Sequence, residues 1–416
     1  MRIEPGKVRA AVTARLGDAQ KVLCDLIAIP SLSGQETAAM ECAERAFAAV
    51  ADVRRVELSD ALRDDDDFSD PVSGIEYAGR WDLRAAIAGE GGGKRLLLNT
   101  HLDVVPPSQG QARPYEPRLI DGAVHGRGAC DAKGQAATIY LAMAALRDLG
   151  VKPGGDVIAH LVVEEEVGGN GTLAMVRHGE QADGCVVLEP TELRVLSSIR
   201  GAVWFRITLR GRPGHPGKVA QSRSALDMGI RVVEILKGYH KRLLEASRGQ
   251  PLFEKYAIPM PLVIGKFQAG NWAATAAGEA QLEGILGLLP NKTARQVLAE
   301  MEQAVRDEGG AEIAENFELR STYRHDSSVC PVDHPLPVAL QAAAKAAGGG
   351  GEIDAMTASC DACFYNNRLK VPTVAFGGGS LGVAHSNEER MPLADLATAA
   401  ETLVHLVLQW CKAVRP

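Results

Sequence analysis

The chain has 416 residues, of which 46% are hydrophobic and 23% are charged, and its formal net charge is -7. This length exceeds one ordinary hydrophobic core, so we expect two domains. The acidic balance argues against a nucleic-acid partner, because phosphate binding needs a basic face. The sequence contains no apolar run of about 18 residues, the length that spans a membrane, and its first residues have no apolar signal core. We therefore expect a cytoplasmic protein with no membrane partner.

Residues 1–200 alternate helices with short apolar strands. The spacing of apolar residues predicts helices at 10–30, 36–50 and 136–150, and apolar runs predict strands at 84–89, 95–101, 156–166 and 184–190. The acidic segment 61–74 between them is expected to be a solvated loop. The repeated order of strand, helix and strand predicts an α/β fold with a mostly parallel mixed sheet flanked by helices.

The pattern changes at residue 201. Strands are predicted at 202–211, 262–270, 280–290 and 314–321, and helices at 224–246 and 294–309, which is the ferredoxin-like α+β order. Two helices at 337–348 and 393–414 and a strand at 371–379 then return to the α/β style. We therefore expect a domain of residues 201–320 inserted into a larger domain formed by residues 1–200 and 321–416.

The eight cysteines are scattered along the chain, unlike a disulfide framework. Cys360 and Cys363 form a single C-x-x-C pair, whereas a zinc finger needs a second pair at similar spacing. A structural zinc or a redox role for this pair is therefore disfavoured.

Several side chains that can bind metals follow predicted core strands or lie in loops beside them. In open α/β sheets, ligands bind at the carboxyl ends of the strands. Each residue also has an ordinary explanation. Asp131 could cap the helix that follows it, His101 could be a buried core imidazole, and the glutamates at 164–166 could form a solvated strand end. Three consecutive glutamates after an apolar strand, however, repel one another unless a cation or a proton compensates. The residues concerned are His101, Asp103, Asp131, Glu164, Glu165, Glu166, Glu189 and His385.

These residue types suit a centre with two divalent ions about 3.5–4 Å apart, in which a carboxylate bridges the ions. Asp131 would be the bridge, with His101 and one glutamate on one ion and His385 and another glutamate on the second. Asp103, two residues after His101, can take the imidazole N–H and fix its tautomer. The remaining glutamate can take a proton from water and give it to a leaving amine. Imidazole with carboxylate favours zinc, with cobalt or manganese as alternatives.

Five motifs together resemble the acetylornithine deacetylase and succinyl-diaminopimelate desuccinylase family of metallopeptidases, which includes carboxypeptidase G-like metallohydrolases. They are HLDVVP, GRGACDAKGQ, EEEVGGNGT, VLEPTEL and VAHSNEE. The resemblance implies a zinc-peptidase-like catalytic domain with an inserted lid and dimerisation domain. It also implies Glu165 as the general base and a cis peptide after Asp131. The metal ligands that it implies are His101, Asp131, Glu166, Glu189 and His385.

The segment RGRPGHPG resembles a family stretch whose histidine reaches an active site, often that of the partner subunit, so His215 is a candidate oxyanion stabiliser. A homodimer through residues 201–320 follows from the same resemblance. Ala274, Gly287 and Cys363 stand where relatives carry side chains that grip a substrate carboxylate. Arg200, Arg324 and His325 are possible substitutes for those side chains.

We therefore expect a metal-dependent hydrolase of amide-type C–N bonds in a small molecule. Deacylation of an N-acyl amino acid is the leading hypothesis. One alternative is dipeptidase or carboxypeptidase activity, and another is hydrolysis of a less usual C–N bond, in a formamide or an aromatic amine. A protein of another class, which binds a phosphate ligand in the Gly-rich stretch HGRGACDAKGQ, is weakly indicated because this stretch lacks both G-x-G-x-x-G and Walker spacing.

Overall fold

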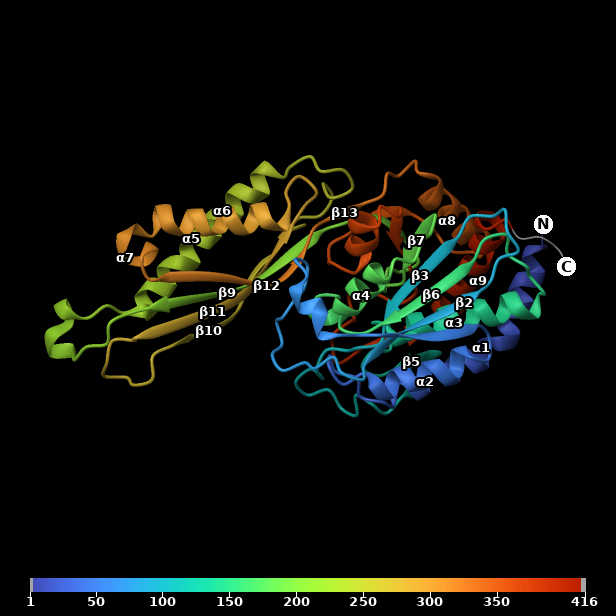
Figure 1. The fold of residues 1–416 in the computed structure, drawn as a ribbon, viewed down its shortest axis with the longest axis horizontal. Coiled ribbons are helices and arrows are strands. Elements are labelled where there is room, and N and C mark those ends of the chain that lie inside the picture. Colours follow the sequence, from blue (N-terminus) through green and yellow to red (C-terminus); the bar gives the residue numbers. More distant parts are fainter. Residues whose placement is uncertain (1–2, 413–416) are drawn as a thin grey trace.

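The computed structural model describes residues 3–412. Within this range no helix is both long enough and apolar enough to cross a membrane. The molecule is elongated, with a larger α/β domain at one end and an inserted domain extending from it at the other (Figure 1). Two separate hydrophobic clusters of buried residues correspond to these two parts.

A nine-stranded mixed sheet forms the centre of the larger domain. Its middle strands pair in parallel, whereas the strands at both edges run antiparallel to their neighbours. The first eight of its strands in spatial order are β1 (Asp52–Glu57), β2 (Trp81–Ile87), β6 (Val157–Val162), β3 (Leu96–His101), β7 (Gly184–Val187), β15 (Thr373–Ala375), β8 (Val195–Ile199) and β13 (Ser328–Val329). The ninth, β14 (Ile353–Met356), pairs in parallel with β8.

Helices flank this sheet, and their apolar residues form most of the larger core. One of them, α3 (Lys133–Asp148), is buried over nearly its whole length because it packs against β3 and against two further helices. Such an environment explains why residues 136–146 of this helix are almost entirely apolar. The helices are α1 (Pro5–Ile27), α2 (Thr37–Phe47), α3, α4 (Asn170–His178), α8 (Pro335–Ala346) and α9 (Leu393–Trp410). A small sheet of β4 (Arg118–Ile120), β5 (Ala123–His125) and β16 (Arg390–Pro392) lies beside them.

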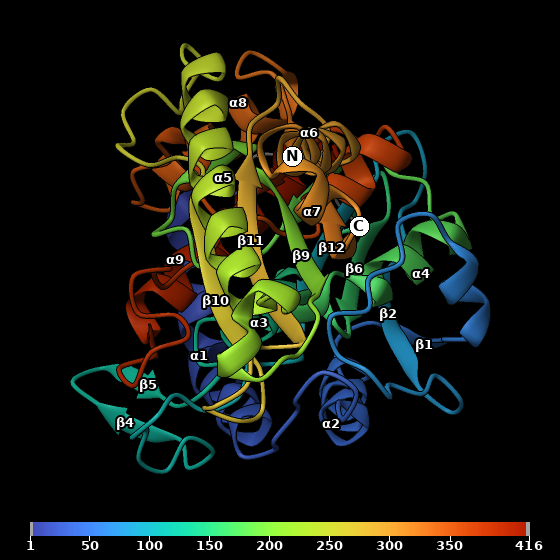
Figure 2. The same ribbon diagram turned by 90° about the vertical axis from the view of Figure 1, so that its left-hand side faces the viewer.

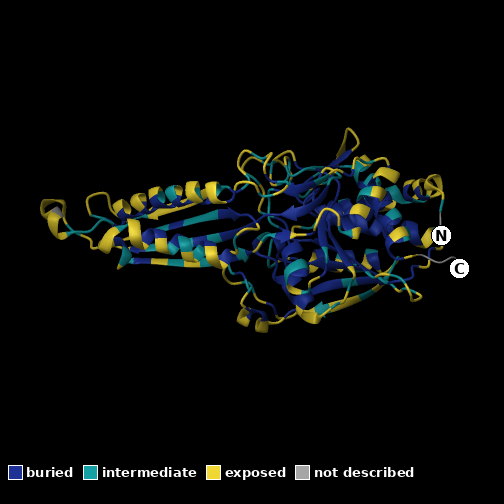
Figure 3. Cartoon of the chain, turned by 90° about the horizontal axis from the view of Figure 1, so that it is seen from above, coloured by how far each residue is buried: buried dark blue, intermediate teal, exposed yellow. Residues whose placement is uncertain are grey.

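The inserted domain is a four-stranded antiparallel sheet in the order β10-β11-β9-β12. Alternate residues of β9, such as Val203, Phe205 and Ile207, are buried in its core. Two long helices cover the face of the sheet that carries these buried residues (Figure 2), and the outer sides of the helices are exposed (Figure 3). In chain order the elements are β9 (Gly201–Arg210), α5 (Ala225–Ala246), β10 (Leu262–Ala269), β11 (Glu279–Leu288), α6 (Ala294–Glu308), α7 (Gly310–Ala314) and β12 (Phe317–His325).

The predicted fold class is confirmed: an α/β domain with a mostly parallel central sheet carries an inserted ferredoxin-like unit. One predicted strand is shorter than expected, because β6 ends at Val162 and not at residue 166. Glu164 has a backbone φ of 61°, which breaks the strand, and a short helix, η2 (Glu165–Val167), follows. The last residues of the helix predicted at 393–414 lie outside the described residues.

The acidic segment was expected to be a solvated loop, and this is wrong for part of it. Asp65 is buried and forms ion pairs with Arg177 and Arg368 of the larger domain. Asp66 binds Arg295 of the inserted domain, with 2.9 Å between the guanidinium nitrogen and the carboxylate oxygen. The segment therefore connects the two domains, because Asp65 binds the larger domain and Asp66 binds the inserted one.

Candidate metal centre

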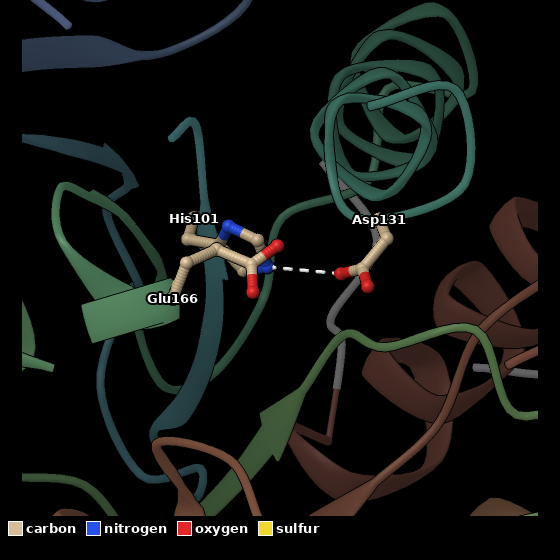
Figure 4. Close-up of side chains that lie close together, drawn as sticks. All are labelled: His101, Asp131 and Glu166. Carbon is tan, nitrogen blue, oxygen red and sulfur yellow. Dashed lines mark hydrogen bonds and ion pairs between the residues drawn. The ribbon is translucent and has the colours of Figure 1, made fainter. Parts of the chain in front are cut away.

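The carboxyl ends of β3 and β6 meet at one edge of the central sheet. His101 is the last residue of β3 and pairs in register with Val162 of β6, so the turn after β6 lies beside it. The loop before α3 brings Asp131 to the same place, where its Oδ1 is 3.1 Å from His101 Nε2 (Figure 4). Glu166 completes a group whose potential ligand atoms all lie within 4.8 Å of one another.

The tautomer of His101 is fixed by its own strand end. Its Nδ1 lies 3.0 Å from the backbone carbonyl oxygen of Asp103, which can only accept, so Nδ1 carries a proton and donates it. In the neutral ring the lone pair of Nε2 then faces Asp131 Oδ1. Two acceptors at this distance repel unless a proton or a cation lies between them. Contacts with Asp103 and Asp131 accordingly raise the pKa of His101, although burial opposes this.

His385 approaches the opposite oxygen of the same carboxylate. Its Nε2 is 3.2 Å from Asp131 Oδ2 and 3.0 Å from Glu166 Oε1. Burial alone would raise the pKa of Asp131, but the contacts with the two imidazoles hold it below its ordinary value. Asp131 thus has a different imidazole nitrogen on each oxygen, which is the arrangement expected of a bridging ligand. The peptide between Asp131 and Ala132 is cis, as the family resemblance implies.

Glu189 and Glu165 are buried beside this group. Burial, together with the negative charge of Asp131, raises the pKa of Glu189 well above its ordinary value. Burial also raises the pKa of Glu165, reinforced by the charge of Asp361 and opposed by His101. Asp361, which lies between the cysteines of the C-x-x-C pair, is a further acidic neighbour, and burial raises its own pKa to about 7.

Asp103 has a larger role than orienting His101. Its carboxylate accepts hydrogen bonds from the backbone N–H groups of Glu165 at 3.0 Å and of Glu166 at 3.1 Å. The hydroxyl of Ser33, which sequence reasoning missed, donates a third hydrogen bond at 2.9 Å. One buried carboxylate therefore holds the turn that carries two of the candidate site residues.

Glu164, the first glutamate of the acidic run, points away from the centre. Its carboxylate accepts hydrogen bonds from Tyr77 Oη at 2.8 Å, from Asn170 Nδ2 at 2.9 Å and from Arg80. The same arginine binds Glu36 at 2.6 Å. This buried network holds the turn on the side that faces away from the candidate metal centre.

Two further sets of predicted residues lie elsewhere. His215 is exposed, its ring accepts a hydrogen bond from the backbone of Gly217, and its segment lies at the outer end of the inserted domain (Figure 1). Within residues 3–412 the chain does not bring it to the centre. Of the candidate substitutes for a carboxylate grip, His325 is buried and bonded to the carbonyl of Gly168. The guanidinium of Arg200, in contrast, lies 3.2 Å from where a Cβ on Gly287 would be.

The model of the peptidase family M20/M25/M40 matches residues 97–409. The chain belongs to this family. It is 26% identical to the N-formyl-4-amino-5-aminomethyl-2-methylpyrimidine deformylase of Bacillus subtilis over 341 residues, which cover 76% of this chain and 79% of that enzyme. It is 29% identical to the succinyl-diaminopimelate desuccinylase of Gluconacetobacter diazotrophicus over 325 residues, which cover 73% and 78% of the two chains.

The fold is also similar to that of a solved dinuclear metal-binding peptidase from Bacillus subtilis. The TM-score is 0.64 at 15% identity, and the match covers 97% of this chain and 100% of that one. Membership of the family confirms the resemblance inferred from the sequence, and with it the expectation of a metallopeptidase-type hydrolase of amide-type C–N bonds.

Proposed function

We propose that His101, Asp131, Glu166, Glu189 and His385 hold two divalent transition-metal ions, with Asp131 between them. The single observation that carries this proposal is the pair of imidazole nitrogens on opposite oxygens of one carboxylate. Cations would also compensate the buried negative charge that raises the pKa values nearby. Imidazole with carboxylate suits zinc best, and also cobalt or manganese. The dinuclear character of the structurally similar peptidase supports two ions.

When bound, divalent cations polarise a carbonyl oxygen and make a nearby water more acidic. The residues of the chain itself carry out the remaining steps. Glu165 takes a proton from the attacking water and gives it to the leaving amine, which is the work of a general base and then a general acid. Asp103 positions Glu165 by accepting a hydrogen bond from the backbone N–H of Glu165. Its backbone carbonyl holds the imidazole of His101 in the tautomer whose Nε2 carries no proton.

The favoured reaction is deacylation of an N-acyl amino acid or a related small molecule. Dipeptidase or carboxypeptidase activity is the first alternative, because the chain belongs to a peptidase family. Hydrolysis of a formamide or of an aromatic amine derivative is the second, supported by the similarity to a deformylase. The side chains that bind a substrate carboxylate in relatives are replaced here by Ala274, Gly287 and Cys363. This replacement weakens the case for a substrate held by its carboxylate.

The rival function, phosphate binding by the Gly-rich stretch before α3, is not supported by the contacts of its basic residues. Arg127 forms an ion pair with the buried Glu389. Lys133 donates to the backbone carbonyl groups of Leu26 and Ile29 at 2.9 and 2.8 Å. Both cations of the stretch are therefore engaged within the protein, and a phosphate would have to displace these contacts.

A homodimer through residues 201–320 is part of the proposal, with His215 reaching the active site of the partner subunit. Apolar side chains on the outside of this domain support it: Leu226 and Ile230 on α5 and Phe267 on the edge strand β10 are all exposed in one chain. Free thiols at all eight cysteines support a reducing compartment such as the cytoplasm.

The test is a screen of N-acyl amino acids, dipeptides and aromatic amides against protein loaded with zinc, cobalt or manganese. We expect cleavage of an amide that stops on treatment with a chelator and returns when the metal is restored. Full activity in a metal-stripped sample, or no cleavage of any of these amides with any of the three metals, would contradict the proposed function.

A further inference from the structure

A cleft of about 660 Å³ separates the inserted domain from the loops of the candidate metal centre. Glu166 lines it, so the cleft reaches the metal centre at one of the residues proposed to hold metal. Its volume lies within the range of about 300–1,000 Å³ that is typical of small-molecule sites. A substrate with its amide bond at the metal centre would extend into this space.

The walls of the cleft are mainly apolar. On the inserted domain, the strand alternation that buries Val203 and Phe205 under the helices turns Trp204 to the opposite face of the sheet, which lines the cleft. Val72 from the larger domain and Val263 from the inserted domain also line it, and they remain 45% and 48% exposed. Apolar surface that stays exposed beside a candidate active site indicates a ligand surface.

The indole of Trp204 is held in one orientation. It stacks on the ring of Tyr323, with 5.1 Å between ring centroids and 16° between ring planes. The Tyr323 hydroxyl lies 2.8 Å from His325 Nδ1 and 2.9 Å from Ser359 Oγ, which fixes that ring in turn. A flat ring of a ligand can stack on an indole held in this way, because aromatic rings associate through offset faces.

The formal charges of the residues that line the cleft cancel, because Arg206 and Lys266 are matched by Glu166 and Glu283. Arg206 and Lys266 are the basic residues among the described residues that line the cleft. Arg206 Nε is 3.1 Å from one carboxylate oxygen of Glu283, and Lys266 Nζ is 3.1 Å from the other. A substrate carboxylate in this cleft would have to compete with Glu283 for both cations. The wall therefore favours a group without charge.

We propose that the cleft binds an uncharged aromatic ring of the substrate, joined to the amide bond that is cleaved and stacked on Trp204. This inference rests on the proposed function, because it assigns the part of the substrate next to the amide. Within that function, it favours the aromatic alternative over an N-acyl amino acid held through its carboxylate.

The test compares three acetamides that differ only in the group beside the amide: acetanilide, N-cyclohexylacetamide and 4-acetamidobenzoate. Their Kd values are measured by ligand-observed NMR, and KM is measured for any compound that is hydrolysed. We expect acetanilide to bind best, with Kd for the other two higher by about tenfold or more. Trp204→Ala should remove the preference for acetanilide over the cyclohexyl compound. Trp272→Ala, at an exposed tryptophan of the same domain that does not line the cleft, should keep it.

A second variant tests the charge argument by a gain of function. Glu283→Gln leaves Arg206 and Lys266 without their shared carboxylate, so 4-acetamidobenzoate should bind about tenfold more tightly than to the wild type. Equal binding of the cyclohexyl or benzoate compound to the wild type, an unchanged preference in Trp204→Ala, no gain in Glu283→Gln, or binding of none of the three would overturn the inference. Failure of the proposed function is distinct, because it would appear as no metal dependence and no amide hydrolysis of any kind.

Discussion

Replacement of Asp103 by asparagine tests how the turn after β6 is held. The carboxylate accepts from two backbone N–H groups, those of Glu165 and Glu166, and from the hydroxyl of Ser33. An asparagine amide has only one acceptor oxygen, so its NH₂ group must face at least one of these donors. A buried donor left without an acceptor costs about 1–3 kcal/mol, and a factor of ten corresponds to about 1.4 kcal/mol. We therefore expect metal affinity and kcat to fall by about 10- to 100-fold each.

Metal affinity is measured by competition with a chromophoric chelator, and kcat with the best substrate from the screen. Ser33→Ala is the matched control, because it removes one neutral donor and leaves the carboxylate with both backbone contacts. It should lower metal affinity by less than about threefold, in keeping with the weak net effect of one neutral hydrogen bond. Wild-type metal affinity and kcat in Asp103→Asn, at unchanged thermal stability, would refute the reasoning.

Three further substitutions test other parts of the account. Glu165→Gln should keep its metal in elemental analysis while kcat falls by about 10²- to 10⁴-fold, and loss of metal together with activity would contradict a purely proton-transferring role. Arg80→Met leaves the buried Glu36 and Glu164 without their cation, so denaturant unfolding should show a loss of about 3–5 kcal/mol, and a loss under about 1 kcal/mol would argue against the network. Burial, with the nearby charge of Arg84, lowers the pKa of His160 to about 3, so as pH falls below 6.5 the unfolded chain takes up a proton there and the folded chain does not. The free energy of unfolding should therefore fall by roughly 2 kcal/mol more between pH 7 and pH 5 in the wild type than in His160→Asn, and equal slopes would contradict this.

Much of the candidate site could be predicted from the sequence because its residues follow apolar runs. An apolar run identifies a strand, and parallel strands bring their carboxyl ends to one edge, so His101 and Glu189 could be placed together without coordinates. The role of Asp131 needed the other candidate ligands as well, because a helix cap explains an aspartate at that position when it is taken in isolation.

The residues alone could not assign the individual roles of the adjacent glutamates, and only the family resemblance distinguished Glu165 from Glu166. Glu164 turns away because Tyr77 and Arg80, far back in the chain, supply its hydrogen bonds, and no local pattern reveals such partners. The proximity of Arg200 to Gly287 could not be predicted either, because only the pairing of β9 with β11 brings these positions together. The role of His215 stays a prediction because it requires a second copy of the chain.

The metal content of the purified protein is the most direct test of the central claim, that imidazole and carboxylate groups gather around two cations. Elemental analysis should find close to two transition-metal ions per chain in the wild type. An Asp131→Ala variant, which lacks the shared carboxylate, should lose metal to chelator dialysis far more readily. No bound transition metal in an active wild-type sample, or equal retention by the variant, would contradict the account.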